Sequence, residues 1–151
     1  MREFPTTDAI LNFAIEREEE ATQFYTDLSG RVNDKRMRQI LLDFALEEQG
    51  HKKKLMAVKE GKQHILPKTK VQDLKIADYL VDVTPGPDIT YQEALTIAMK
   101  KEKAAFKLYN MLATSTDNRQ LQSLFYALAQ EEAKHKLRFE IEYDDLVYKE
   151  F

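Results

Sequence analysis

No cysteine occurs among the 151 residues of this chain. That absence excludes disulfide bonds, thiolate zinc sites, iron–sulfur clusters and a cysteine nucleophile within it. Long apolar runs are missing too, since none approaches the roughly 20 residues of a membrane-spanning helix. Residues 1–5 contain no apolar segment of the kind that a secretion signal needs. We therefore expect a cytoplasmic protein with no membrane partner.

An excess of basic residues is also missing. The chain has 23 Lys and Arg against 26 Asp and Glu, for a formal net charge of −3. Nucleic-acid-binding domains need a basic surface, so this balance argues against nucleic acid as a partner. Glycine and proline are few, at four each, which leaves room for long helices. We expect residues 1–151 to form one domain around a single sizeable core.

Four segments place apolar residues three and four positions apart, which is the spacing of one face of a helix. Turn and capping residues divide these segments near positions 29–34, 61, 89–90 and 114–117. The pattern predicts two helix pairs, at about residues 7–61 and 89–148, as an internal repeat. Residues 62–89 hold three of the four prolines and join the pairs, and 71–83 could form a short helix.

The turns within each pair are short, so each pair is expected to be antiparallel. The link at 62–89 is long for a bundle loop. At about 3.3 Å per residue it can cross a helix of about 25 residues, which is about 38 Å long. We expect it to start the third helix at the same end as the first. The predicted fold is all-α: an antiparallel four-helix bundle with one long crossover between helices 2 and 3.

Polar positions in the first half of the chain recur in the second at a constant offset of 84 residues. Each half contains a Glu-x-x-His segment, a further glutamate and a tyrosine. The matched pairs are Glu48/Glu132, His51/His135, Glu18/Glu102 and Tyr25/Tyr109. Duplication of a helix pair explains a repeat equally well, but it does not explain why these polar matches fall on apolar faces.

Each repeated glutamate shares a helix face with apolar residues three, four and seven positions away, so each points into the core. Burying an ionised carboxylate without a partner costs several kcal/mol. Two divalent cations would supply the positive charge that four carboxylates need, and the histidines add nitrogen donors one turn along. We predict a dinuclear metal site with these ligands: Glu18, Glu48, His51, Glu102, Glu132 and His135.

Other polar residues are interpreted as ordinary surface or core positions. Glu47 and Glu131 lie about 100° around their helices from the neighbouring ligands, which favours a surface role over an outer hydrogen-bonding role. His64 lies in the proline-containing link and is read as a surface residue. Tyr25 and Tyr109, taken individually, are core aromatics whose hydroxyls have partners. No catalytic residue is predicted beyond the metal centre.

These residues resemble the pattern of the ferritin-like di-iron carboxylate superfamily, and within it the rubrerythrin-like branch, over about residues 7–145. The resemblance implies these roles: bridging ligands Glu48 and Glu132, terminal ligands Glu18 and Glu102, one histidine per ion in His51 and His135, and hydrogen bonds to ligand carboxylates from Tyr25 and Tyr109. The chain departs from full-length rubrerythrins at Ala105, where they carry a further glutamate, and it lacks their four-cysteine rubredoxin-type domain.

The resemblance also implies a cofactor of two iron ions that reacts with dioxygen or hydrogen peroxide. The expected activity is that of a peroxidase- or ferroxidase-type oxidoreductase in oxidative-stress chemistry, with electrons from a separate donor protein. We expect a homo-oligomer, with a dimer favoured. Manganese with catalase-like chemistry is the enzymatic alternative, because the sequence cannot choose between the two metals. The non-enzymatic alternatives are an iron-binding or storage subunit and a bundle that binds no metal.

Overall fold

Four helices make up the computed structural model, which describes residues 7–61 and 89–149. They are α1 (Thr7–Ser29), α2 (Lys35–Glu60), α3 (Tyr91–Thr114) and α4 (Arg119–Lys149). The described ranges contain no strand, and the predicted all-α fold is confirmed. Among these helices, none is long and apolar enough to cross a bilayer. The short helix considered at 71–83, His64 and the crossover lie outside the described residues.

Short polar side chains set two of the helix starts. At the start of α2, Asp34 Oδ1 accepts the backbone N–H of Arg36 at 2.9 Å. At the start of α3, Thr90 Oγ1 accepts the backbone N–H of Glu93 at 3.1 Å. These bonds satisfy donors that have no partner within the helix, and each such cap stabilises a helix by about 1 kcal/mol.

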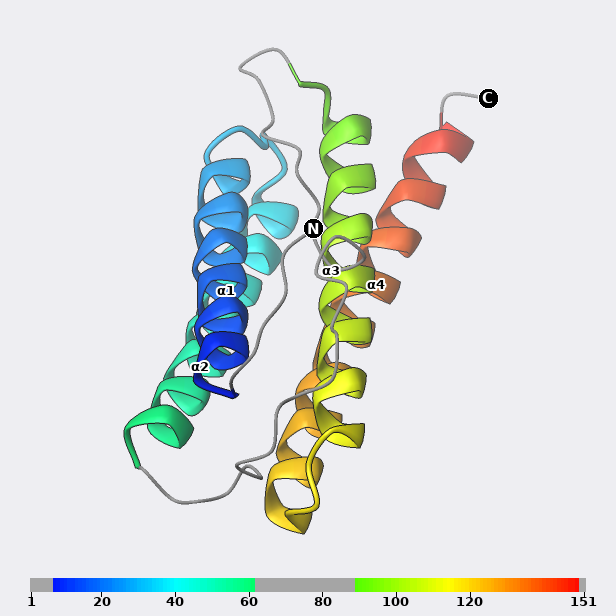
Figure 1. The fold of residues 1–151 in the computed structure, drawn as a ribbon. Coiled ribbons are helices and arrows are strands. Elements are labelled where there is room, and N and C mark those ends of the chain that lie inside the picture. The colour runs from blue at the N-terminus through cyan, green and yellow to red at the C-terminus, as the bar shows by residue number, and fades with distance from the viewer. Residues whose placement is uncertain (1–6, 62–88, 150–151) are drawn as a thin grey trace.

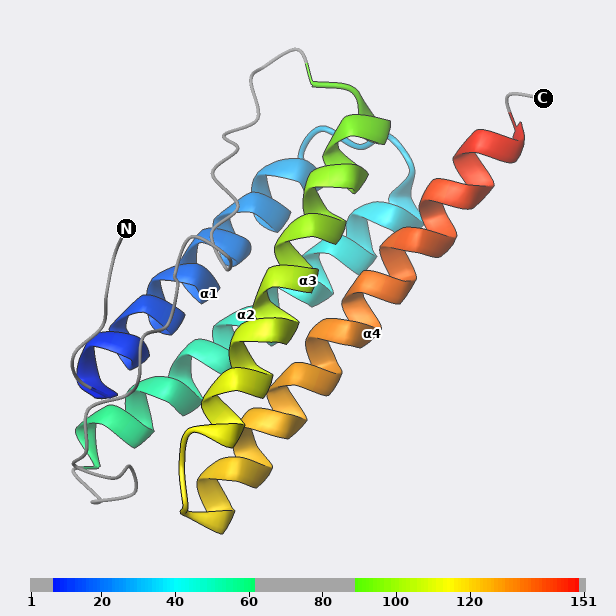
Figure 2. The same cartoon turned by 45° about the vertical axis from the view of Figure 1, so that its right-hand side comes forward.

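The helices form two hairpins, α1 with α2 and α3 with α4, which lie side by side (Figure 1). Figure 2 shows the same pairing from another side, with α4 running along α3 over most of its length. Each hairpin is antiparallel, as its short turn predicts. The bundle is therefore built from two similar halves, one for each copy of the sequence repeat.

The start of α3 differs from the sequence-based expectation. We expected it at the same end as the start of α1, but α3 begins beside the turn that joins α1 to α2 (Figure 1). A cavity at this end is lined by Leu28 and Val32 from one hairpin and by Ile89 and Tyr91 from the other. The expectation was wrong for a geometric reason. Because α2 ends at the end of the bundle where α1 begins, the start of α3 lies at the end opposite both (Figure 1).

Two apolar clusters fill the two ends of the bundle, and both hairpins contribute to each. One cluster contains Leu11, Leu55 and Phe125, and the other contains Leu41 and Phe139. Burying one such side chain stabilises the fold by about 1.5–3 kcal/mol. The residues predicted as metal ligands lie between the clusters, so the core encloses them in a layer shielded from water.

Candidate metal centre

All six side chains that the sequence predicts as ligands lie in one buried layer. They are Glu18 from α1, Glu48 and His51 from α2, Glu102 from α3, and Glu132 and His135 from α4. None of them is more than 3% exposed. Because each glutamate comes from a different helix, the layer forms only when all four helices pack together.

The spacing within α2 explains how this helix presents two polar groups to the core. Glu48 and His51 share the buried face of α2 with Leu41, Ala45 and Leu55. Residues three apart on a helix lie one turn above each other, so the carboxylate and the imidazole point toward the same place. The matched segment of α4 presents its own pair in the same way.

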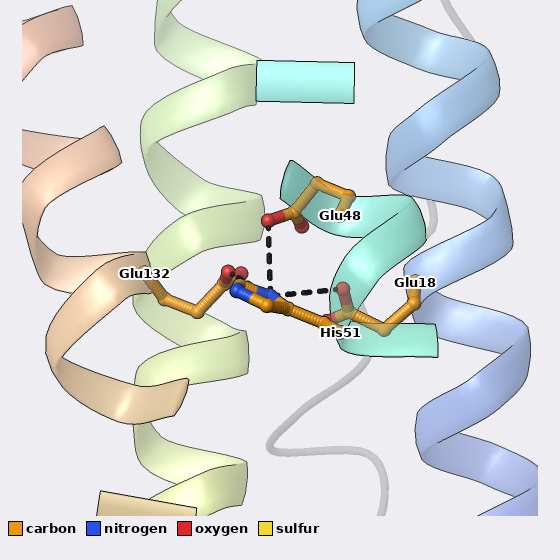
Figure 3. Close-up of side chains that lie close together, drawn as sticks. All are labelled: Glu18, Glu48, His51 and Glu132. Carbon is orange, nitrogen blue, oxygen red and sulfur yellow. Dashed lines mark ion pairs between the residues drawn. The ribbon is translucent and has the colours of Figure 1, made fainter. Parts of the chain in front are cut away.

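The ring of His51 faces three carboxylates, as Figure 3 shows. Its Nδ1 atom lies 3.0 Å from Glu132 Oε1, 3.2 Å from Glu18 Oε2 and 3.3 Å from Glu48 Oε1. One nitrogen or oxygen atom from each of these four residues lies within 4.8 Å of the others. The group is compact enough to surround a single ion.

A second group of the same size contains His135 with Glu48, Glu102 and Glu132. Here His135 Nδ1 lies 3.3 Å from Glu48 Oε1, 3.6 Å from Glu102 Oε2 and 3.9 Å from Glu132 Oε1. Glu48 and Glu132 belong to both groups. Two shared carboxylates place the two ion positions next to each other, which is the arrangement of a dinuclear carboxylate site.

Six buried polar atoms in this layer approach one another without forming hydrogen bonds. They are Glu18 Oε2, Glu48 Oε1, Glu102 Oε2, Glu132 Oε1, His51 Nδ1 and His135 Nδ1. Leaving a buried polar group unpaired costs about 1–3 kcal/mol, and more for a charged group. Carboxylate oxygen and imidazole nitrogen together suit divalent ions such as iron or manganese. The residues present therefore fit a dinuclear metal centre.

Two buried tyrosines connect the hairpins at this layer. Tyr109 Oη donates a hydrogen bond of 2.6 Å to Glu18 Oε1, and Tyr25 Oη donates one to Glu102 Oε1. Burial raises the pKa of both hydroxyls well above the ordinary value, so both remain protonated donors. Each tyrosine therefore fixes a carboxylate that belongs to the other hairpin.

Comparison with known proteins places the chain in a family. The family model described as Rubrerythrin matches residues 9–79 and 93–150, which is most of the chain. The chain belongs to the rubrerythrin family. A search of curated proteins found no match.

Two solved structures resemble this rubrerythrin-family chain. A protein from Thermotoga maritima, described as a ferritin-like diiron-carboxylate protein, matches with a TM-score of 0.81 and 22% identity, over 95% of this chain and 98% of its own. A hypothetical protein from Pyrococcus furiosus matches with a TM-score of 0.71 and 21% identity, over 93% of this chain and 90% of its own. These likenesses confirm the ferritin-like bundle.

Three of the four core carboxylates in this rubrerythrin-family chain hold protons readily when no metal is bound. Burial raises the pKa of Glu18 to about 8. Burial also raises the pKa of Glu102 and, further, that of Glu132. Glu48 differs, because its contacts with both histidines outweigh its burial and lower its pKa to about 2.

The two histidines also hold protons in the metal-free layer. Burial alone would lower the pKa of His51, but the adjacent carboxylates of Glu18 and Glu48 raise it to about 11. Burial is likewise outweighed at His135, where Glu102 and Glu48 raise the pKa to about 10. Protons therefore occupy several of these groups in the absence of metal, and metal binding must displace them.

Glu47 and Glu131 contact the histidines from outside the layer. Their side chains are 52% and 39% exposed, in keeping with the surface position that the sequence indicated. Yet Glu47 Oε2 lies 2.7 Å from His135 Nε2, and Glu131 Oε2 contacts His51 Nε2. From the sequence, a surface role was favoured over this outer hydrogen-bonding role. The signal in its favour was the repeat, since the two glutamates match at the 84-residue offset.

Proposed function

We propose that this rubrerythrin-family chain holds two iron ions and performs redox chemistry with hydrogen peroxide or dioxygen. It would act as a peroxidase that receives electrons from a separate protein, or as a ferroxidase whose electrons come from the ferrous ions that it oxidises. The observation that carries the proposal is the set of six buried oxygen and nitrogen atoms that face one another without hydrogen bonds. Iron bound there would supply the electron transfer to an oxidant, which carboxylates and imidazoles cannot supply themselves.

The chain's own residues would bind the two ions and hold the ligand side chains in orientation. Glu48 and Glu132 belong to both groups of the layer, so they would bridge the two ions. Each ion would also have one terminal glutamate and one histidine: Glu18 with His51, and Glu102 with His135. The tyrosine hydroxyls hold the terminal carboxylates in place from the opposite hairpin. The apolar clusters at both ends keep bulk water away.

A small cavity reaches the site between α1 and α3. It has a volume of about 30 Å³, and all four core glutamates line it. A space of about 10–15 Å³ holds one water molecule, so this cavity suits molecules of the size of dioxygen or hydrogen peroxide. Ala21 and Ala105 keep its walls small, and Arg17 and Lys101 add positive charge. The dimensions support a small oxidant in preference to an organic substrate.

Metal content and turnover test the proposal together. Wild-type protein purified without added metal would be analysed beside a Glu48→Ala, Glu132→Ala double variant. We expect about two iron ions per wild-type chain, one for each group, and loss of both in the variant. The wild type should also consume peroxide only when a reduced electron donor is supplied.

Other outcomes separate the alternatives. Two manganese ions per chain, with peroxide disproportionation in the absence of a donor, would replace iron chemistry with a catalase-like reaction. A closed particle of many subunits filled with iron would indicate storage. Protein that takes up neither ferrous nor manganous ion would overturn the dinuclear proposal and leave a structural bundle.

A further inference from the structure

Each buried histidine is held on its outer side by a glutamate of the opposite hairpin. His51 on α2 contacts Glu131 on α4, and His135 on α4 contacts Glu47 on α2 at 2.7 Å. In both cases the contact uses the Nε2 atom, while the Nδ1 atom faces the core carboxylates. Each hairpin thus supplies one carboxylate that contacts a histidine of the other hairpin.

These contacts fix which ring nitrogen can bind a metal. A neutral imidazole carries one N–H donor and one lone pair. A carboxylate that accepts the hydrogen of Nε2 leaves the lone pair on Nδ1, which is the atom that lies 3.0 Å from Glu132 Oε1 in the case of His51. A carboxylate on the outer nitrogen also fixes the plane of the ring and makes its other nitrogen a better metal ligand.

The surroundings of the two outer glutamates support a specific contact. Both line one hollow between α2 and α4, together with Lys134, His135 and Arg138. Arg138 in this hollow pairs with Glu142, at 2.9 Å, along its own helix. Each outer glutamate instead reaches across to a histidine that is almost completely buried.

We propose that Glu47 and Glu131 are positioning residues of the metal centre, each orienting the other hairpin's histidine so that Nδ1 faces an ion. The inference rests on the proposed metal binding and deepens it. Glu131 serves the group that contains His51, and Glu47 serves the group that contains His135. Metal binding and the docking of the two hairpins are therefore coupled through two reciprocal contacts.

The assignment predicts that each single substitution weakens one ion position and spares the other. The full-length metal-free protein would be titrated with Co²⁺, whose visible absorption reports the number and geometry of its ligands. The set comprises wild type, Glu131→Ala, Glu47→Ala and a control, Glu60→Ala, which removes an exposed glutamate near the end of α2. Loss of such an outer partner costs about 10–100-fold in metal affinity. We expect that loss at one of two sites in each single variant and none in the control.

A conservative substitution separates positioning from folding. Glu131→Gln keeps a side-chain oxygen that can accept the Nε2 hydrogen, so it should restore part of the Co²⁺ affinity and the wild-type absorption spectrum. A role in folding alone would lower the thermal stability of the metal-free Glu131→Ala protein while both Co²⁺ affinities stay at the wild-type values. That result would overturn the inference.

Double variants identify which histidine each glutamate serves. Glu131→Ala should cause little further loss in a His51→Ala background, where its partner is already gone, and its full loss in a His135→Ala background. Equal losses in both backgrounds would overturn the assignment. If wild-type protein binds two Co²⁺ and the outer variants match the control, only this inference fails. If wild-type protein binds no metal, the proposed function fails with it.

Discussion

The two halves of the metal layer have the same residues but different surroundings. The first half-site contains Glu18 and His51, and the second contains Glu102 and His135. In the first, His51 Nδ1 lies 3.0–3.3 Å from three carboxylate oxygens. In the second, the corresponding distances for His135 Nδ1 are 3.3–3.9 Å. Repetition of the sequence has preserved the ligands without making the two positions equal.

Packing around the imidazoles differs as well. The ring of Phe44 stacks on His135 with 4.0 Å between centroids. The residue that matches Phe44 in the second half of the chain is Leu128. His135 therefore has an aromatic neighbour across the bundle, whereas the matched position in the second half of the chain carries an aliphatic residue. Two ions held in this layer should differ in affinity although their ligands have the same chemistry.

The largest effect is expected when a residue that both half-sites share is removed. Glu48 belongs to both groups, whereas Glu18 belongs to one. Glu48→Ala should therefore lose both ions, with affinities reduced by more than about 100-fold, since even outer partners cost about 10–100-fold. Glu18→Ala should retain one ion. Elemental analysis of the two purified variants measures this, and equal metal content would contradict the shared role of Glu48.

The next effect concerns pH, because protons and metal ions compete for the same atoms. In the metal-free protein the pKa of Glu18 is raised from 4.5 to about 8, so the stability that its protonated form contributes is complete below pH 4.5 and lost as the pH rises to about 8. The pKa of His51 is raised from 6.5 to about 11, so the stability that its protonated form contributes begins to fall near pH 6.5. Glu48, whose pKa is lowered from 4.5 to about 2, contributes stability above pH 4.5 that is lost only as the pH falls toward 2.

Metal-free protein should therefore become less stable between about pH 5 and pH 8, and bound metal should reverse this trend. At Co²⁺ concentrations near 100 times the dissociation constant, each site adds about 2.7 kcal/mol to the free energy of unfolding. Denaturant unfolding across this pH range, with and without Co²⁺, measures both slopes. Parallel slopes would show that metal does not displace the protons of this layer.

Much of the fold and the site could be predicted from local spacing. Apolar steps of three and four placed the helices close to their observed bounds, and residues such as Asp34 and Thr90 cap helices where the sequence indicated. The same spacing put Glu48 and His51 on one face, because helix geometry fixes which residues share a face. All six predicted ligands came together because each lies on the buried stripe of its own helix.

The predictions that fell short concern how the helices are placed relative to one another. Periodicity describes each helix about its own axis, so it could not show that α3 starts beside the α1–α2 turn. It also placed the outer hydrogen-bonding role of Glu47 second to a surface role, because the histidine that this exposed glutamate contacts lies on another hairpin. Only the three-dimensional arrangement shows that Tyr25 reaches Glu102, 77 positions away.

Removing one tyrosine hydroxyl should affect one half-site more than the other. Tyr109→Phe leaves Glu18 Oε1 without its 2.6 Å hydrogen bond, and Tyr25→Phe does the same to Glu102 Oε1. An unsatisfied buried acceptor costs about 1–3 kcal/mol. We expect that decrease in the free energy of unfolding of each metal-free variant, with weaker Co²⁺ binding only at the half-site that lost its donor. Tyr126→Phe, which removes the hydroxyl of a tyrosine that is 45% exposed on α4, serves as the matched control.

The smallest expected effect tests the packing difference directly. Phe44→Leu would place beside His135 the residue type that the repeat has at the matched position, Leu128. An aromatic contact of this kind contributes about 0.5–1.5 kcal/mol, which corresponds to a change of up to about tenfold in affinity. Measured in a Glu18→Ala background, which retains the second half-site, Phe44→Leu should weaken the remaining Co²⁺ by that amount. In a Glu102→Ala background, which retains the first, Co²⁺ affinity should stay unchanged. Equal weakening in both backgrounds would mean that Phe44 supports the whole layer, and the inequality of the half-sites would then have to come from the carboxylate distances alone.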